Sequence, residues 1–264
     1  MITHFFIDID ETLAYTVKPE HEEEAVDVGN GFFVAKSNLE KLREVRIAGV
    51  KFGLVTTRRF STAILALNSI PHDYAVVDHG TIILIGGEPD TEWLETLRPY
   101  IGNPLTREKR GGLWDYEQQL RLELGREGFE IYSDDRFGSF RVAPPRPVTK
   151  PVLERLLQIS RPQGIDAIIV GEFVDFFPSV AGKANGVKRV LSREGVTDYT
   201  SVAYAGDGIS DLAALSQFYP LTTAEADSIA RDIVRARVGY ESPSNHVKHE
   251  AAKDIISYVV AMSR

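Results

Sequence analysis

The chain opens with Phe5-Phe6-Ile7-Asp8-Ile9-Asp10-Glu11-Thr12-Leu13, an apolar run that ends in two aspartates. Residues 5–9 have the composition of a short buried strand. Since side chains two positions apart on a strand point to the same side, we expect Asp8 and Asp10 to emerge together, about 6 to 7 Å apart. Ionised carboxylates at a buried strand end are costly unless cations or hydrogen-bond donors compensate them. The stretch predicts either a solvated strand end before a turn or a metal-assisted site with one aspartate as nucleophile.

A calcium-binding loop of the Asp-x-Asp-x-Asp-Gly type is a third interpretation of the same stretch. Such a loop needs glycine at its sixth position and a bidentate glutamate at its twelfth. Counted from Asp8, these positions hold Leu13 and Pro19. The sequence therefore excludes a calcium loop.

Composition narrows the class of protein. With 264 residues, 43 % of them hydrophobic, the chain can bury one large domain or a domain with an insertion. The net charge of −8 and the dispersed basic residues give no attraction to nucleic acid or to an anionic membrane. There is no cysteine, so any metal site uses oxygen ligands. With no signal segment and no apolar stretch of about 18 residues, we expect a cytoplasmic protein, a monomer or small homo-oligomer.

Helices and strands are expected to alternate in the two outer parts of the chain, residues 1–85 and 179–264. Besides a hairpin turning at Asn30-Gly31 and a first helix capped by Ser37, the pattern predicts strands near 50–55, 74–77, 81–85, 201–205 and 219–222 and helices near 62–67, 183–194, 210, 224–235 and 245–262. This order predicts an α/β fold with a Rossmann-like parallel sheet and helices on both faces.

The middle of the chain, residues 86–178, follows a different pattern. Helices are expected near 92–100, 114–126 and 150–160, and strands near 129–132, 139–142, 165–170 and 173–177. This order predicts a small antiparallel α+β layer inserted into the first domain.

Polar clusters follow two further strands of the predicted sheet. Thr56-Thr57-Arg58-Arg59 comes after strand 50–55, and Gly206-Asp207-Gly208-Ile209-Ser210-Asp211 comes after strand 201–205. The glycines beside Asp207 allow a tight turn and a close approach to a ligand. Because the carboxyl ends of parallel strands share one edge of a sheet, we expect both clusters to lie near Asp8, where open α/β sheets bind ligands.

Taken in order, these groups resemble the four motifs of the haloacid dehalogenase superfamily: Asp8 and Asp10, Thr56, Lys183, then Asp207 and Asp211. The inserted layer is similar to the α+β cap of the sugar-phosphatase branch, which includes Cof-like, sucrose-phosphatase-like, mannosyl-phosphoglycerate-phosphatase-like and phosphomannomutase-like enzymes. The resemblance implies a catalytic core over residues 1–85 and 179–264 and a substrate-specificity cap over residues 86–178.

The resemblance also implies roles for single residues. Asp8 would attack phosphorus, Asp10 would act as acid and base, Thr56 would bind a phosphoryl oxygen, and Lys183 would hold Asp8. Mg²⁺ would be held by Asp8, by the backbone carbonyl of Asp10 and by Asp207, with Asp211 supporting metal-bound waters or Lys183. The resemblance assigns phosphate or substrate binding to Thr12, Thr57, Arg58, Gly208 and His79. The implied reaction is Mg²⁺-dependent hydrolysis of a small phosphorylated metabolite such as a sugar phosphate; a phosphomutase and a non-catalytic binding protein are the alternatives.

The chain departs from the usual motifs at Glu11 and Thr57, where glycine is common, at Ser210, where asparagine is common, and at His79, where relatives often have a substrate-facing asparagine. For residues outside the motifs we expect structural roles: a solvated basic turn for Arg107, Lys109 and Arg110, core packing for Trp93, Trp114, Phe137 and Phe140, solvent exposure for Arg59, and a surface helix face for His246 and His249.

Overall fold

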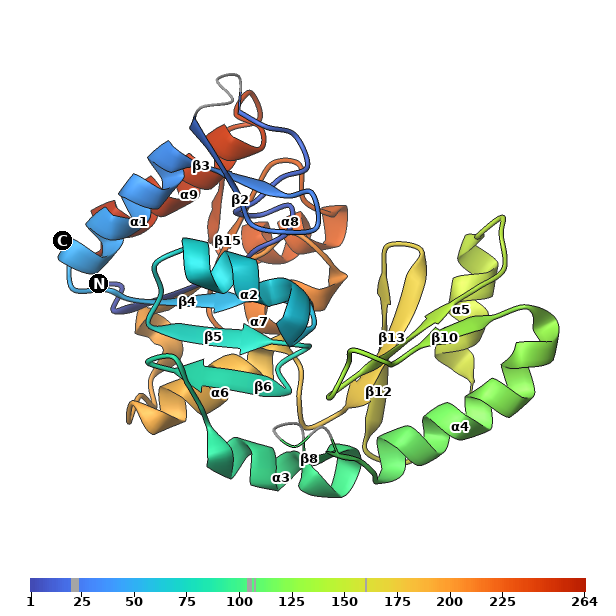
Figure 1. Ribbon diagram of the computed structural model, residues 1–264. Coiled ribbons are helices and arrows are strands. Elements are labelled where there is room, and N and C mark those ends of the chain that lie inside the picture. Colours follow the sequence, from blue (N-terminus) through green and yellow to red (C-terminus); the bar gives the residue numbers. More distant parts are fainter. Residues whose placement is uncertain (20–23, 104–105, 107, 160) are drawn as a thin grey trace.

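The computed structural model describes residues 1–19, 24–103, 106, 108–159 and 161–264, which form two lobes (Figure 1). An eight-stranded sheet runs through the larger lobe. Its strands, in spatial order, are β16 (Tyr240–Glu241), β15 (Tyr219–Thr222), β14 (Val202–Ala205), β1 (His4–Asp8), β4 (Lys51–Val55), β5 (Tyr74–Val77), β6 (Ile82–Ile85) and β7 (Glu88–Pro89). Neighbours from β16 to β5 pair in parallel, and β6 and β7 are antiparallel.

Alternation along β1 explains why helices cover both faces of this sheet. Phe5 and Ile7 belong to one apolar core, shared with α1 (Lys36–Ile47), α2 (Phe60–Ser69) and α9 (His249–Met262). Phe6 belongs to the core on the other face, shared with α6 (Lys183–Arg193), α7 (Leu212–Leu215) and α8 (Ser228–Ala236). A strand whose two faces are both buried is expected to be apolar in its centre, as β1 is at Phe5, Phe6 and Ile7. The predicted fold class is confirmed.

The smaller lobe contains a four-stranded antiparallel sheet in the order β10 (Glu130–Tyr132), β11 (Phe140–Ala143), β13 (Phe173–Pro178) and β12 (Ile165–Val170). The helices of this part of the chain are α3 (Thr91–Ile101), α4 (Gly112–Leu124) and α5 (Lys150–Gln158), with a short pair β8 (Gly102–Asn103) and β9 (Glu108–Lys109). Figure 1 shows this α+β unit beside the carboxyl edge of the large sheet. The expected antiparallel layer is therefore present. Among the helices of the described residues, none has the length and apolar character required to cross a membrane.

The hairpin of β2 (Ala25–Asp27) and β3 (Phe33–Ala35) turns at Asn30 and Gly31, as predicted, and both turn residues have positive φ, 57° and 75°. The predicted cap Ser37 is wrong, because β3 runs directly into α1 and the extended residue Ala35 precedes the helix.

Three later helices begin after their predicted starts. The last helix begins at His249 rather than near Asn245, since Lys248 has a left-handed backbone with φ 53°. Residue 210 lies in the 3-10 turn η5 (Ile209–Asp211) before α7. The helix predicted from residue 224 begins at Ser228, because residues 223–226 form a hydrogen-bonded turn.

Candidate active site

The strand order brings the three polar strand ends together. β14, β1 and β4 are neighbours, so Asp207, Asp8 and Thr56 leave the same edge of the parallel sheet side by side. The parallel pairing of these strands thus brings together side chains that are far apart in the sequence.

Lys183 reaches this edge from the first turn of α6. Its Nζ lies 2.8 Å from Oδ2 of Asp8 and 2.8 Å from Oδ1 of Asp211, and the lysine and both acids are buried. Burial alone would lower the pKa of the Lys183 ammonium, but the charges of Asp211 and Asp8 outweigh it and raise that pKa. Lys183 therefore carries its charge into the centre of the cluster.

A close backbone contact fixes the start of α6. The amide of Gly182 donates to the carbonyl of His79 at 2.6 Å. A Cβ atom added to Gly80 would lie only 2.4 Å from the carbonyl oxygen of Gly182, and Gly80 has φ +80°. Only glycine combines that backbone with that approach. The turn between β5 and β6 thus supports the start of α6, where Lys183 lies.

Three carboxylates form a cluster that fits a metal ion. One carboxylate oxygen from each of Asp8, Asp207 and Asp211 lies within 4.8 Å of the others. Thr12 donates to Asp207 at 2.8 Å, and the hydroxyl of Tyr204 donates to Asp211 at 2.5 Å. Hard cations such as Mg²⁺ and Ca²⁺ prefer such oxygen ligands.

Electrostatics also favours a cation at this cluster. Burial raises the pKa of the Asp8 carboxyl well above its usual range, in spite of Lys183, and burial together with Asp211 raises the pKa of Asp207 to about 7. Three acids around a single lysine leave negative charge uncompensated. A divalent cation would supply the missing positive charge.

Asp10 does not join that cluster. Its carboxylate is held by the buried guanidinium of Arg58, whose Nε lies 2.9 Å from Oδ2 and whose Nη2 makes a further short contact. The expectation that Asp8 and Asp10 point to one spot is wrong for their carboxylates, because β1 ends at Asp8 and the alternation of a strand stops there. Asp8 faces Lys183, whereas Asp10 faces a cavity.

The turn after Asp10 adopts the backbone that glycine favours. Glu11 has φ 58°, and the amides of Leu13 and Ala14 both donate to the carbonyl of Ile9. Residue 11 therefore has the left-handed backbone conformation that glycine favours, even though it is a glutamate.

The remaining motif residues lie around the same edge. Thr56 is fully buried, and its hydroxyl accepts from the amide of Arg58 at 3.1 Å. The amide of Gly208 donates to Asp211 at 3.3 Å. Thr57 is half-buried and lines the cavity that Asp10 faces. Thr12 contacts Asp207, as described above, so its hydroxyl supports the acid cluster.

A cavity of about 670 Å³ separates this edge from the α+β unit. On the side of the large sheet it is lined by Asp10, Thr57 and Arg58. The opposite wall includes Arg136 and Arg141 of the α+β unit, together with Tyr132 and Phe173. The space is large enough for a small polar molecule between the two lobes.

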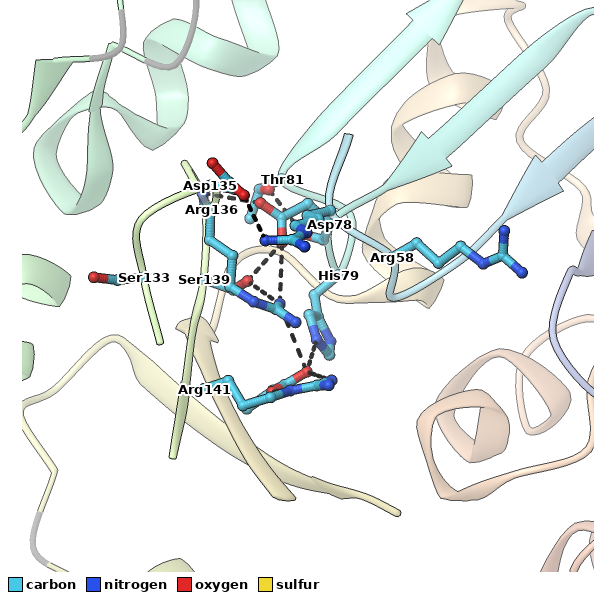
Figure 2. Close-up of polar contacts among 12 residues, drawn as sticks. Arg58, Asp78, His79, Thr81, Ser133, Asp135, Arg136, Ser139 and Arg141 are labelled. Atoms are coloured by element: carbon cyan, nitrogen blue, oxygen red, sulfur yellow. Dashed lines mark hydrogen bonds and ion pairs between the residues drawn. The ribbon is translucent and has the colours of Figure 1, made fainter. Parts of the chain in front are cut away.

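His79 links the two lobes (Figure 2). Its Nε2 lies 2.8 Å from Oδ2 of Asp175 on β13, and its ring stacks on Phe177 at 4.8 Å. Arg141 on β11 binds the same Asp175 through Nε at 2.6 Å and Nη2 at 2.7 Å. The sequence analysis missed Arg136, Arg141 and Asp175. For Arg141 and Asp175 the detectable signal was a charged residue inside an apolar strand, whereas Arg136 lies in the connection between β10 and β11 and gave no such signal.

The residues outside the motifs divide between core and surface. Trp93, Trp114 and Phe140 are buried in the core, as expected, and Phe137 is half-buried. In the predicted basic turn, Arg110 is exposed and pairs with Glu108, and Arg107 lies outside the described residues. The prediction is wrong for Lys109, whose ammonium group is not solvated: it lies over the Trp114 ring and donates to the carbonyl of Ser133.

Three other surface predictions have mixed outcomes. Arg59 is partly exposed, as expected, and pairs with Asp135 of the α+β unit. His246 and His249 do not share a helix face, because His246 precedes α9. Both are half-buried, with His246 paired to Asp254 and His249 bound to the carbonyl of Val17.

Solved structures share this architecture. The chain is similar to a sucrose-phosphatase from Synechocystis in complex with sucrose and phosphate, with 14 % identity, coverage of 98 % of each chain and a TM-score of 0.69. It is similar to a putative HAD/COF-like hydrolase from Plasmodium vivax, with 16 % identity, coverage of 98 % of this chain and 94 % of the other, and a TM-score of 0.66. A sugar phosphatase of HAD subclass IIB aligns with 13 % identity over 98 % of this chain and 99 % of the other, with a TM-score of 0.65.

At these identities the likeness establishes the fold. The match is to the fold of the haloacid dehalogenase superfamily, and within it to the sugar-phosphatase branch. No protein-family model and no curated protein matches the sequence. The expected resemblance is therefore confirmed at the level of structure.

Proposed function

We propose that this protein is a Mg²⁺-dependent phosphatase that hydrolyses a small phosphorylated metabolite through an aspartyl phosphate on Asp8. The observation that carries the proposal is the contact of Asp8 with Lys183, at 2.8 Å, inside a cluster of three carboxylates at the carboxyl edge of a parallel sheet. Phosphoryl transfer needs mainly positioning and charge neutralisation, and this cluster supports both.

In the first step, a carboxylate oxygen of Asp8 attacks phosphorus, and the bond from phosphorus to the substrate oxygen breaks. The leaving alkoxide takes a proton from the carboxyl of Asp10, which faces the cavity. In the second step, water gives a proton to Asp10 and bonds to phosphorus, and the electron pair of the acyl-phosphate bond returns to Asp8. Phosphate and the free enzyme result.

Other residues of the chain hold these groups in place. Lys183 orients Asp8 and neutralises charge on the transferring phosphoryl oxygens. Arg58 keeps the carboxylate of Asp10 at the wall of the cavity through two of its nitrogens. The hydroxyl of Thr56 would donate a hydrogen bond to a phosphoryl oxygen, since Thr56 directly follows β4, whose last residue pairs with Asp8.

The metal assignment rests on the donor set. Asp8 and Asp207 would hold Mg²⁺ together with the carbonyl of Asp10, and Asp211 would support Lys183, to which it is bound at 2.8 Å. When bound, the ion supplies positive charge to the phosphoryl oxygens and compensates the carboxylate cluster. The raised pKa values of Asp8 and Asp207 also support a cation there, because burial and, second to it, neighbouring acids disfavour their ionised forms, and a bound cation would offset both effects.

We also propose that residues 86–178 act as a cap that sets substrate specificity. The cavity between the two lobes supports this role, because it lies between Asp10 and the α+β unit, whose side chains would limit the size of a substrate bound there. The sugar phosphatases with the same fold favour a sugar phosphate or a sugar-derived phosphate as the substrate class.

The test is phosphate release from a panel of sugar, polyol, nucleotide and acid phosphates, with Mg²⁺ and with EDTA. Asp8→Asn preserves the size of the side chain and removes the nucleophile. Asp232→Asn is the matched control, since Asp232 is exposed on α8. We expect release that requires Mg²⁺, is lost in Asp8→Asn and is unchanged in Asp232→Asn.

Two results would contradict the proposal. Isomerisation of a sugar phosphate without net phosphate release would indicate a phosphomutase. Binding of a phosphorylated compound with no turnover in any condition would indicate a protein that keeps the fold without the reaction.

A further inference from the structure

The α+β unit carries a buried group of charges that the proposed reaction does not use. Arg141 lies opposite Asp175 in the pairing of β11 with β13, in the middle of both strands. Apolar neighbours flank each of them, and Asp175 is fully buried. An apolar pair would hold these strands together at lower cost, because both charges must lose water.

Two buried acids fix the arginines of this unit. Asp175 binds Arg141 through both of its oxygens, and Nη1 of Arg136 lies 3.7 Å from it and 3.8 Å from Asp78. Although burial alone would raise it, the pKa of the Asp175 carboxyl is lowered by hydrogen bonds from Arg141 and His79. Arg136 also donates to Ser139 at 2.9 Å. Both guanidinium groups are therefore oriented before any ligand arrives.

The arginines, and not the acids behind them, line the cavity. Arg136 and Arg141 are part of its wall, whereas Asp78 and Asp175 are not. Figure 2 shows both arginine side chains reaching from the α+β unit toward the turn that carries His79. Within the part of the chain that the structure describes, Nη1 of Arg141 and Nη2 of Arg136 have no hydrogen-bond partner, and neither atom is buried without access to solvent.

The wall of the cavity is rich in arginine. The lining residues include four arginines, Arg58, Arg59, Arg136 and Arg141, against two acids, Asp10 and Glu11. Arg58 is paired with Asp10 and Arg59 with Asp135, and the charges of Arg136 and Arg141 are matched by Asp78 and Asp175 behind them. What the α+β unit presents to the cavity is therefore a set of oriented guanidinium N–H donors. Guanidinium groups bind carboxylate and phosphate groups through paired hydrogen bonds.

We propose that Arg136 and Arg141 bind a second anionic group of the substrate, a carboxylate or a phosphate, distinct from the phosphoryl group that is transferred. This inference rests on the proposed function, since it takes the cavity between Asp10 and the arginines as the place of the substrate. It narrows the substrate class to phosphorylated compounds that carry another negative charge, such as sugar bisphosphates and phosphorylated sugar acids.

Matched substrates test the inference on the unmodified protein. Glucitol 6-phosphate and 6-phosphogluconate are both open chains that differ by a carboxylate, and fructose 6-phosphate and fructose 1,6-bisphosphate differ by a phosphate. We expect kcat/KM to be about 10- to 100-fold higher for the compound with the second anion in at least one pair, as for a charge-assisted paired hydrogen bond. The pair with the larger ratio identifies the anion.

Substitutions then locate the group responsible. Arg141→Gln is expected to remove most of the preference by raising KM for the compound with the second anionic group, with little change in KM for the compound that carries only the transferred phosphate. Arg141→Lys keeps the positive charge but loses the paired N–H donors of the guanidinium group, so we expect a ratio of kcat/KM values between those of the unmodified protein and Arg141→Gln. This variant replaces Arg141→Gln as the test if the glutamine variant does not fold. Arg155→Gln is the control, since Arg155 is an exposed residue of α5 paired with Glu127.

The outcomes separate this inference from the proposed function. Hydrolysis of both members of each pair at equal kcat/KM would overturn the inference and leave the phosphatase intact. If nothing is hydrolysed, the proposed function fails, and calorimetric titration with the same pairs still tests the anion site. Equal affinities for both members of each pair would then overturn the inference as well.

Discussion

Replacing Lys183 with methionine tests how the buried carboxylates of Asp8 and Asp211 are held. The substitution keeps an unbranched side chain and removes the charge. Lys183 is bound to Asp8 and Asp211 at 2.8 Å each. At an effective dielectric constant of about 20, each contact is a gross attraction of about 6 kcal/mol, most of which offsets the loss of water by the buried groups.

The expected net loss is about 3 to 5 kcal/mol in the free energy of unfolding, the usual cost of leaving buried charges without their partner. Urea unfolding in EDTA at about pH 8 measures it. Lys188→Met is the matched control on the same helix, because Lys188 makes no ion pair with any described residue. We expect its effect to stay below about 1 kcal/mol.

The pH dependence supplies a second readout. The pKa of Asp8 is already above its usual range, and a carboxyl whose pKa is raised by folding favours the folded state at low pH and loses that advantage as the pH rises. The deficit of Lys183→Met should therefore shrink at about pH 5.5, where protonation removes unpaired charge. A deficit equal to that of Lys188→Met, or one that does not change with pH, would refute this account of the cluster.

Other consequences follow from the same geometry. Gly80→Ala should lower the free energy of unfolding by at least about 2 kcal/mol in urea titrations, since its Cβ would lie 2.4 Å from the Gly182 carbonyl oxygen. Tyr204→Phe should cost about 1.5 to 3 kcal/mol, because the hydroxyl donates to buried Asp211; an unchanged urea midpoint would contradict this. Mg²⁺ should raise the melting temperature more at about pH 8 than at about pH 5.5, because Asp207, whose pKa is about 7, is ionised only at the higher pH.

The position of the site could be predicted from local patterns because topology follows from them. Apolar runs that end in acids at Asp8 and Asp207 predict parallel strands, and parallel strands bring their carboxyl ends to one edge. That prediction needed no knowledge of packing. The split of Asp8 and Asp10 onto different partners could not be predicted, because it depends on where β1 ends and on a buried arginine 48 residues away.

The place of Arg136 and Arg141 on the cavity wall could not be predicted from local sequence patterns, for a different reason. Arg141 and Asp175 are 34 residues apart, and only the register of β11 with β13 makes them neighbours. His79 stands where an asparagine is expected, but its contact with Asp175 depends on the relative position of the two lobes, which no local pattern encodes. A charge in the centre of an apolar strand signals that a partner exists without identifying it.

The most direct test of the central claim is to trap the phosphorylated enzyme. With a phosphate ester that has a good leaving group, such as p-nitrophenyl phosphate, Asp10→Asn should still form the acyl phosphate but hydrolyse it slowly, since the base that activates water is missing. Acid quenching followed by peptide mass spectrometry should find an alkali-labile phosphoryl group on Asp8. If no covalent phosphate accumulates in Asp10→Asn under conditions in which the unmodified protein turns over, or if it lies on another residue, Asp8 is not the nucleophile.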